Sequence, residues 1–454
     1  MYLIDALPDD VLLGIFYFYV DVSPSYGGKS KVEAWQLLVH VCRRWRTLVL
    51  ESPRRLNLRL VCTHKTPAKD TLNIWPALPL IVQGNITSSR TDNIITALGQ
   101  SNRVCYVDFY LGGWQLEQVL AAMHVPFPEL TELRLWSNGE TMPVIPDSFL
   151  DGSAPRLQAF FLDGIPFLGF PKLHLSAPHL VYLHLYNIPH SGYISPEAIV
   201  ALISALSSLE QLSLEFQSPQ SCPDRETRRP PSKRSVIPAL FYFHFKGVIE
   251  YLEVLVAGID TPRLEELGIT FFNQIDFDTP RLAQFINRTP NLRKHNATVQ
   301  FDDDFARVRL SLSSLEILIS CREPDWQLSS IEQVCNSSLH HPLSLVEDLY
   351  IEHAYSELLW KDDPIESTLW WQLLLPFTAV KNLFLSKDSA PGTATALKEL
   401  VGGRITEVLP SLENIFVKGL EPSGPVQENI GQFVGARLLS SHAISISDWD
   451  GRRR

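Results

Sequence analysis

The sequence predicts an α/β protein in which a short helical N-terminal segment precedes a right-handed solenoid with a parallel inner sheet. Two observations predict this fold class. Residues 1–52 carry apolar residues at helical spacing, whereas a short apolar phrase recurs along the rest of the chain. A chain of 454 residues, 45% of them apolar, exceeds one compact core and favours several domains or an elongated repeat array.

Residues 1–52 contain two helical patterns separated by a polar break. The first pattern places apolar residues on one helical face: Leu7, Val11, Leu12, Ile15 and Phe16. Pro8 suits the first turn of a helix, and the second pattern, over residues 35–49, ends before Pro53. Because so small a helical unit buries little surface, we expect part of its apolar face to meet a partner.

The segments LPDDVLLGIF (7–16) and VCRRWRTLV (41–49) resemble an F-box, since the opening Leu-Pro, the acidic pair, the Ile-Phe and the closing Val-Cys-basic-basic-Trp occur in order. The resemblance implies binding to the Skp-type adaptor of a cullin–RING ubiquitin ligase. The adaptor-binding residues that it implies are Leu7, Pro8, Val11, Leu12, Ile15, Phe16, Val41, Cys42, Trp45 and Leu48. The stretch Asp21–Ala34 is longer than the usual connection, which leaves the path of the middle helix open.

From about residue 100, a Pro/Ser approach followed by Leu-x-x-Leu-x-Leu or a close variant recurs. The second apolar position of each copy falls at residues 107, 133, 160, 183, 212, 243, 267, 295, 318, 349, 383, 415 and 444. These markers are 23 to 34 residues apart, and such a period with this phrase is typical of leucine-rich repeats. Alternate residues of a strand point to opposite faces, so the spaced leucines face the core and each unit must stack on its neighbours.

Several segments between the expected strands have helical spacing: Gln115–His124, Pro196–Leu206, Val248–Ala257, Leu369–Leu375 and Ala394–Val401. The predicted domains are an F-box (1–52), a transition (53–100), about thirteen irregular repeats (101–446, with a basic loop insertion at 217–235) and a C-terminal tail (447–454). Within the transition, residues 54–61 and 75–84 look like strands, and Thr91–Gln100 looks helical. The whole combination resembles F-box proteins that form large families in mushroom-forming fungi.

The residues beside the marked leucines are expected on the open side of the sheet, as a surface for a target protein. Aromatic residues and Arg tend to anchor protein interfaces, which favours this surface for recognition. Its predicted members are Arg134, Trp136, Phe161, Tyr182, His184, Tyr186, Tyr242, Tyr350, Phe384 and Phe416. For each single ring, coverage by a terminal segment or a packing neighbour remains an alternative.

Composition and motifs narrow the classes of function. The net charge of −11 argues against nucleic acid as a partner. The apolar run Val11–Val20 covers about half a bilayer span, and acidic residues stand where a signal peptide is basic. We therefore expect a cytoplasmic or nuclear protein without a membrane partner. HExxH, GxSxG and GxGxxG motifs are absent from the sequence, so no catalytic residue, metal site or cofactor is predicted.

Two non-catalytic functions fit these patterns. The first is a substrate-receptor subunit of an SCF-type cullin–RING ubiquitin ligase, in which the F-box binds the Skp-type adaptor and the repeats bind a target protein. The alternative is a leucine-rich-repeat scaffold or regulatory protein whose N-terminal helices only cap the solenoid. The sequence leaves the identity of the target open, and also whether recognition needs a modification.

Overall fold

A computed structural model describes the chain in two compact units, Met1–Leu180 (unit 1) and Val181–Arg454 (unit 2). The boundary between them falls inside one of the predicted repeat copies, residues 177–186, and the sequence gives no sign of it. The described residues are 7–21, 34–65, 67–86, 91–137, 143–146, 149–168, 173–221, 234–273, 276–311, 314–353, 367–400, 404–439 and 442–451. The predicted loop within Asp21–Ala34 and most of the basic insertion lie outside them.

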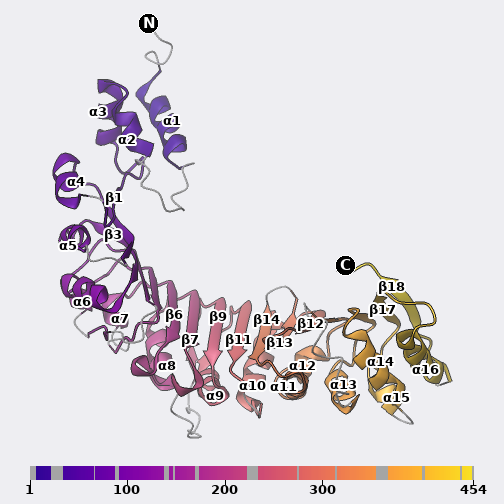
Figure 1. The fold of residues 1–454 in the computed structure, drawn as a ribbon. Helices are drawn as coiled ribbons and strands as arrows, with labels where there is room; N and C mark the ends of the chain where they lie inside the picture. Colours follow the sequence, from indigo (N-terminus) through magenta and orange to yellow (C-terminus); the bar gives the residue numbers. More distant parts are fainter. Residues whose placement is uncertain are drawn as a thin grey trace. The chain divides into compact units, whose positions relative to one another are not determined.

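The N-terminal segment of unit 1 forms three helices, α1 (Asp9–Asp21), α2 (Ala34–Val39) and α3 (Arg43–Glu51), which Figure 1 shows side by side. The predicted second helical pattern is divided in two, because Cys42 has extended backbone and caps the start of α3. The helices share an apolar core, whose fully buried members include Leu12, Phe16, Trp35 and Val49. The three helices therefore form a core of their own without a partner protein.

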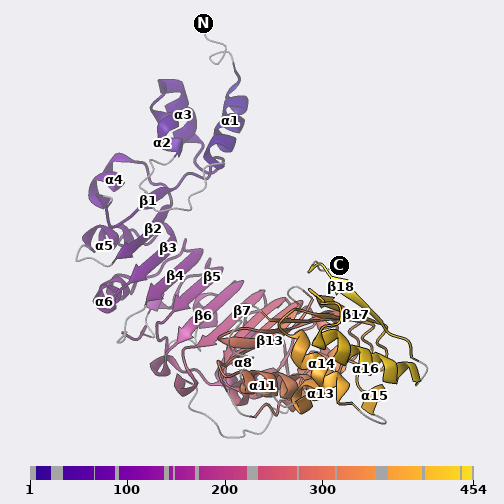
Figure 2. The same cartoon turned by 45° about the vertical axis from the view of Figure 1, so that its right-hand side comes forward.

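The rest of unit 1 is a parallel sheet with helices beside it (Figures 1 and 2). Its strands, in sheet order, are β1 (Leu60–Cys62), β2 (Leu80–Ile86), β3 (Val104–Leu111), β4 (Glu132–Ser137) and β5 (Ala159–Asp163). The helical elements are α4 (Ala68–Ile74), α5 (Asp92–Leu98), α6 (Gly113–Ala122), η2 (Phe149–Gly152) and α7 (Leu173–Ser176). Because β1 pairs in parallel with β2, and β2 with β3, the predicted transition already belongs to the sheet.

Unit 2 continues the pattern of alternating strand and helix. Its sheet runs in the order β6 (Tyr182–Ile188), β7 (Gln211–Phe216), β9 (Tyr242–Gly247), β11 (Glu266–Phe271), β14 (Leu315–Ser320), β13 (Phe305–Leu310), β12 (Asn296–Phe301), β15 (Asp348–His353), β16 (Asn382–Leu385), β17 (Asn414–Lys418) and β18 (Ser445–Trp449). A separate pair joins β8 (Ser235–Val236) to β10 (Ile259–Asp260). Each of the thirteen repeat copies thus contains a strand.

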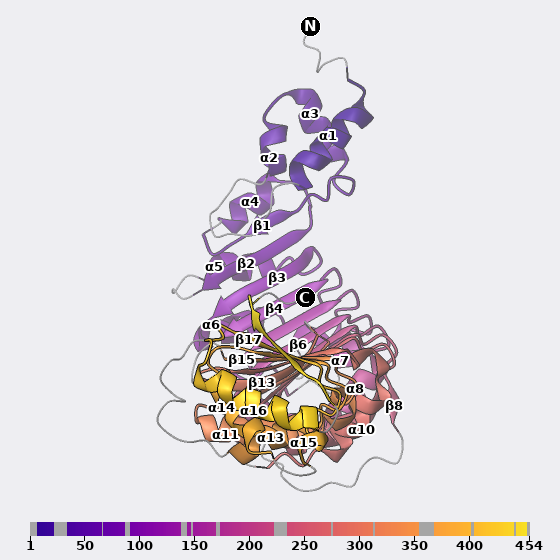
Figure 3. The same cartoon turned by 90° about the vertical axis from the view of Figure 1, so that its right-hand side faces the viewer.

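The helices of unit 2 lie along one face of its sheet (Figures 1 and 3). They are α8 (Pro196–Ala205), α9 (Ile249–Ala257), α10 (Pro280–Arg288), α11 (Pro324–Ser337), α12 (His340–Leu343), α13 (Ser367–Leu374), α14 (Ala390–Lys398), α15 (Arg404–Glu407) and α16 (Pro425–Leu439). Short 3-10 turns add η4 (His190–Gly192), η5 (Pro219–Ser221) and η6 (Pro290–Leu292). Ser195 caps α8, since its Oγ accepts a hydrogen bond from the Ala198 amide at 3.2 Å.

The sheet of unit 2 is mostly parallel, and the predicted parallel inner sheet is interrupted by one antiparallel strand. Strand β13 is antiparallel to both β12 and β14, so the three strands form a meander within the sheet. The connection from β12 to β13 is only Asp302–Asp304, closed by a hydrogen bond from the Asp302 amide to the Phe305 carbonyl at 2.8 Å. Three residues suffice for a hairpin, whereas a parallel crossover needs a dozen or more. The leucine phrase missed β13 because its buried residues are Ala306, Val308 and Leu310.

The two faces of each sheet differ in burial. Strands such as β4, β9 and β11 alternate strictly between buried and half-buried residues, as a sheet with one covered face should. Most of the marked positions are on the buried side; Leu133, Leu212 and Leu267, for example, are fully buried. The prediction is wrong at Leu318, which is half-buried because Ile317 and Ile319 of β14 face the core instead, and at His295, which is exposed just before β12. The chain is therefore an α/β protein in which helices alternate with the strands of a mostly parallel sheet. We call the half-buried sides the unit 1 open face and the unit 2 open face.

Candidate functional site

The first candidate site is a set of exposed apolar side chains on the N-terminal helices. On α1, Val11, Ile15 and Phe18 follow one another at steps of four and three residues and are 46%, 49% and 69% exposed. On α2 and the turn after it, Leu37 and Val41 are four residues apart and also exposed. Large apolar side chains exposed in rows on helices that already have a core mark a surface for a partner. Phe18 and Leu37 were not among the predicted adaptor-binding residues, although the sequence places Phe18 at helical spacing from Val11 and Ile15.

The structure divides the ten residues that the F-box resemblance assigned to the adaptor. Pro8, Val11, Ile15, Val41 and Cys42 are exposed, and Leu7, Trp45 and Leu48 are half-buried. Leu12 and Phe16 are only 1% exposed, so the prediction that they face an adaptor is wrong. The physical reason is packing, because their side of α1 meets α2 and α3 and forms the core of the helical segment.

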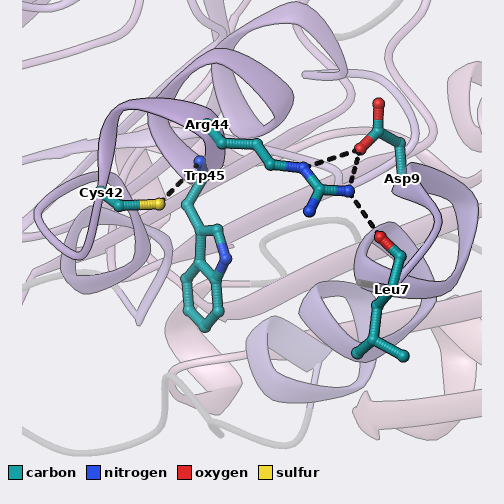
Figure 4. A network of polar contacts seen from close by, with 5 residues as sticks. All are labelled: Leu7, Asp9, Cys42, Arg44 and Trp45. Atoms are coloured by element: carbon teal, nitrogen blue, oxygen red, sulfur yellow. Dashed lines mark hydrogen bonds and ion pairs between the residues drawn. The ribbon is translucent and has the colours of Figure 1, made fainter. Parts of the chain in front are cut away.

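An arginine holds the start of α1 against α3 (Figure 4). Arg44 Nε and Nη2 donate to Asp9 Oδ1 at 3.1 and 2.6 Å, and Nη2 also donates to the Leu7 carbonyl. Cys42 Sγ accepts the Trp45 amide at 3.5 Å, which caps α3, and Arg55 pairs with Asp10 at 2.8 Å. The acidic pair of the motif therefore anchors the Leu-Pro turn through Arg44 and Arg55, and no pattern in the sequence indicated this role for the two arginines.

The unit 1 open face carries three of the residues predicted for target binding. Arg134, Trp136 and Phe161 are half-buried on adjacent strands, as the alternation predicted. The Arg134 guanidinium lies 4.5 Å above the Phe161 ring and forms an ion pair with Glu132. Trp136 Nε1 donates to Asp108 Oδ1 at 3.1 Å. These contacts hold the side chains in fixed positions on a surface that solvent reaches.

On the unit 2 open face, strands β6 to β11 carry a polar cluster. Tyr182, Tyr186 and Tyr242 are half-buried, as predicted. His184 is only 6% exposed, so its prediction as a contact residue is wrong. Its Nδ1 lies 2.9 Å from both Ser213 Oγ and the Tyr186 hydroxyl, which enclose the ring between neighbouring strands.

The neighbouring imidazole of this cluster, His244, lies over a glycine. A Cβ on Gly268 would come within 2.6 Å of His244 Nδ1, so this position favours glycine because of the close approach. His244 Nε2 lies 3.4 Å from Glu215 Oε1. Burial lowers the pKa of His244; Glu316 opposes this shift and Lys246 adds to it.

This lowered pKa predicts a loss of stability in acid. An unfolded histidine takes up its proton near pH 6.5, whereas folded His244 does so at lower pH, so its contribution is complete above about pH 6.5 and is lost as the pH falls through the folded pKa. We expect the urea midpoint of the full chain to fall between pH 7.5 and 5 and to fall less in His244→Gln. His341→Gln makes the same substitution at an exposed histidine and serves as the control, and a wild-type slope in His244→Gln would contradict the prediction.

At the C-terminal end of unit 2, the predicted target surface is closed by the chain itself. Tyr350, Phe384 and Phe416 stack in register on β15, β16 and β17, with ring centroids 4.4 and 4.7 Å apart. Trp449 of β18 packs against Tyr350 and Phe384 at 5.9 and 5.5 Å. Tyr350 and Phe384 are therefore buried, and their prediction as exposed anchors is wrong, while Phe416 is partly buried. Trp449 also shows that the last strand extends into the predicted tail.

Trp449→Ala should uncover this aromatic stack. Removing a large buried aromatic side chain costs about 3–5 kcal/mol in unfolding free energy, here drawn from the last strands of unit 2. We expect a lower melting temperature and faster amide hydrogen exchange in β16 to β18, measured on the full chain. Asp448→Asn, on the exposed neighbouring residue, is the matched control. If amide hydrogen exchange in β16 to β18 were as slow in Trp449→Ala as in the control, the Trp449 ring would not contribute to the stability of these strands, and the prediction would be wrong.

The described residues hold neither a group of three or more His, Cys, Asp or Glu side chains placed for a metal ion, nor a helix with the length and apolar character needed to cross a bilayer. The candidate sites described above are built from helices in one case and from sheet faces in the other.

Comparisons with known proteins add little to these sites. No family model matches the chain, and no curated protein matches it. One similar solved structure is the leucine-rich repeat-containing protein LegL7 from Legionella pneumophila, at 14% identity, with 83% of this chain and 98% of that chain covered and a TM-score of 0.27. So low a TM-score carries no argument, and the fold assignment rests on the strand and helix repeat described above.

Proposed function

We propose that the chain is the substrate-receptor subunit of an SCF-type cullin–RING ubiquitin ligase. In this proposal the N-terminal helices bind the Skp-type adaptor, the sheet faces bind a target protein, and the chemistry takes place on other subunits. The receptor acts by proximity, because it raises the local concentration of target lysines near the ubiquitin carrier.

The observation that carries the proposal is the exposure of the motif's apolar residues. Val11, Ile15 and Val41 belong to the F-box-like pattern and remain in solvent although the helices have a complete core. A helical segment that needed only to cap the repeats would turn such residues toward them. Half-buried Trp45 and Leu48 on α3 extend the apolar surface available to an adaptor.

A second function has one observation in its favour. Trp35 of α2 is 1% exposed, its Nε1 donates to the Arg59 carbonyl at 3.0 Å, and its ring lies 5.0 Å from that of Trp75. The helices are thus joined to the segment around β1, as expected of a cap. This supports the alternative of a leucine-rich-repeat scaffold whose N-terminal helices only stabilise the first strands.

The deciding experiment is capture of a purified Skp-type adaptor by the full chain. The receptor proposal expects a complex that survives size-exclusion chromatography, and the scaffold alternative expects none. Capture that is lost on substitution of the exposed α1 residues would assign the contact to this surface, whereas a wild-type chain that captures no adaptor would overturn the proposal.

A further inference from the structure

The unit 1 open face presents an ordered grid of aromatic and charged side chains. Strands β3, β4 and β5 are parallel and in register, so residues opposite one another form rows across the face. The rows are Tyr106, Glu132 and Ala159; Asp108, Arg134 and Phe161; and Tyr110, Trp136 and Asp163. All of these except Ala159 are half-buried, so solvent and a partner reach them.

Asp108 lies at the centre of this grid and orients two aromatic side chains. Its Oδ1 accepts a hydrogen bond from Trp136 Nε1 at 3.1 Å, and its Oδ2 accepts one from the Tyr106 hydroxyl at 3.2 Å. Both donors are neutral, so these bonds leave the negative charge of the carboxylate in place. Rings fixed in this way lose little further freedom when a partner binds, which favours affinity.

The charge of the grid is negative. It contains three carboxylates, Asp108, Glu132 and Asp163, against one guanidinium, Arg134, which is bound to Glu132. Burial, and to a smaller extent the nearby Asp108, raise the pKa of the Tyr106 hydroxyl well above its ordinary value. An acidic or phosphorylated segment would be repelled here, whereas a cation would be attracted by the carboxylates and by the faces of Trp136 and Tyr110.

From this arrangement we propose that the unit 1 open face binds a basic segment of a target protein, with a lysine or arginine side chain seated against Asp108 and Trp136. The proposal deepens the target-binding half of the proposed function and does not depend on the adaptor. It assigns recognition to unit 1, whereas on the unit 2 open face the C-terminal aromatic stack is closed by Trp449.

The test is a selection of random short peptides, displayed on phage, for binding to the full chain. We expect the bound pool to be enriched in Lys and Arg for the wild type and to lose that enrichment for Asp108→Asn and Trp136→Ala. Asp70→Asn removes the same charge from exposed α4 in the same unit and should select as the wild type does. The melting temperature of each variant is measured, and adaptor capture is measured in parallel and should be equal in all of them.

A selected peptide is then synthesised with arginine or with uncharged citrulline at its basic position. Calorimetry should show about tenfold weaker binding for the citrulline peptide, and likewise for Asp108→Asn with the arginine peptide, which corresponds to about 1.4 kcal/mol. Trp136→Phe keeps a ring but loses the Nε1 donor to Asp108, and should bind with intermediate affinity. A pool rich in acidic or purely apolar peptides, no enrichment by the wild type, or equal binding to the wild type and Asp108→Asn would each overturn the proposal.

Discussion

The double variant Val11→Asp/Ile15→Asp should lose capture of a Skp-type adaptor, with affinity about a hundredfold or more below that of the wild type. Both side chains are about half exposed and lie on one face of α1. Two carboxylates placed in an apolar interface must be desolvated there without partners, and that cost appears as lost affinity. Because neither residue belongs to the buried core of the helices, the melting temperature should stay close to that of the wild type.

The matched control for this variant is Ile74→Asp. Ile74, at the end of α4, is also a large apolar residue of unit 1 and is 73% exposed, so it takes the same new charge in a similar setting away from α1. Adaptor binding by calorimetry should be unchanged in the control. If the double variant bound as tightly as the control, the α1 row would not be the adaptor surface and the receptor proposal would lose its main support.

The sequence predicted the repeat better than the boundaries around it. A strand occurs in each of the thirteen copies because alternating apolar residues follow the covered face of a sheet, although the phrase assigned the wrong face to Leu318 of β14. The phrase missed β13, whose three inward side chains include only one leucine, and the predicted tail began at residue 447 although β18 continues to Trp449. Both errors have one cause, because the phrase detects leucine, whereas most of the buried residues at these two places are of other types.

For the candidate sites, the sequence pattern predicted on which face of a helix or strand a residue lies, but not whether its side chain is buried there. The F-box resemblance grouped Ile15 with Phe16, yet in the structure one is exposed and the other is in the core. On the sheet, Trp136 and Tyr350 follow the same strand rule, but only Tyr350 has a tryptophan from a distant strand packed against it. Coverage of this kind depends on contacts between segments far apart in sequence, which local periodicity does not contain.

Trp35→Ala should have the opposite effect to the α1 double variant. The Trp35 ring is fully buried against Trp75 and its Nε1 donates to the Arg59 carbonyl, so truncation leaves a cavity and an unpaired carbonyl at the junction of α2 with the first strand. Loss of a buried tryptophan costs about 3–5 kcal/mol of unfolding free energy. Leu37→Ala on the same helix is the control, since Leu37 is exposed and its loss should change stability by about 0.5 kcal/mol or less. Urea unfolding of the full chain, followed by tryptophan fluorescence, measures both.

The two variants together separate docking from capping, which deletion of residues 1–50 does not. Deletion removes Trp35 along with the α1 row, so it would destabilise unit 1 whether or not the helices bind an adaptor. Substitution of Trp45 would also combine an effect on adaptor binding with an effect on stability, because its ring centroid lies 4.7 Å from that of buried Phe16. If the helices only cap the repeats, Trp35→Ala lowers stability and the α1 double variant changes nothing that can be measured. If they also bind the adaptor, the double variant loses adaptor capture while its stability stays unchanged. Only contact between the α1 row and a second protein explains that result.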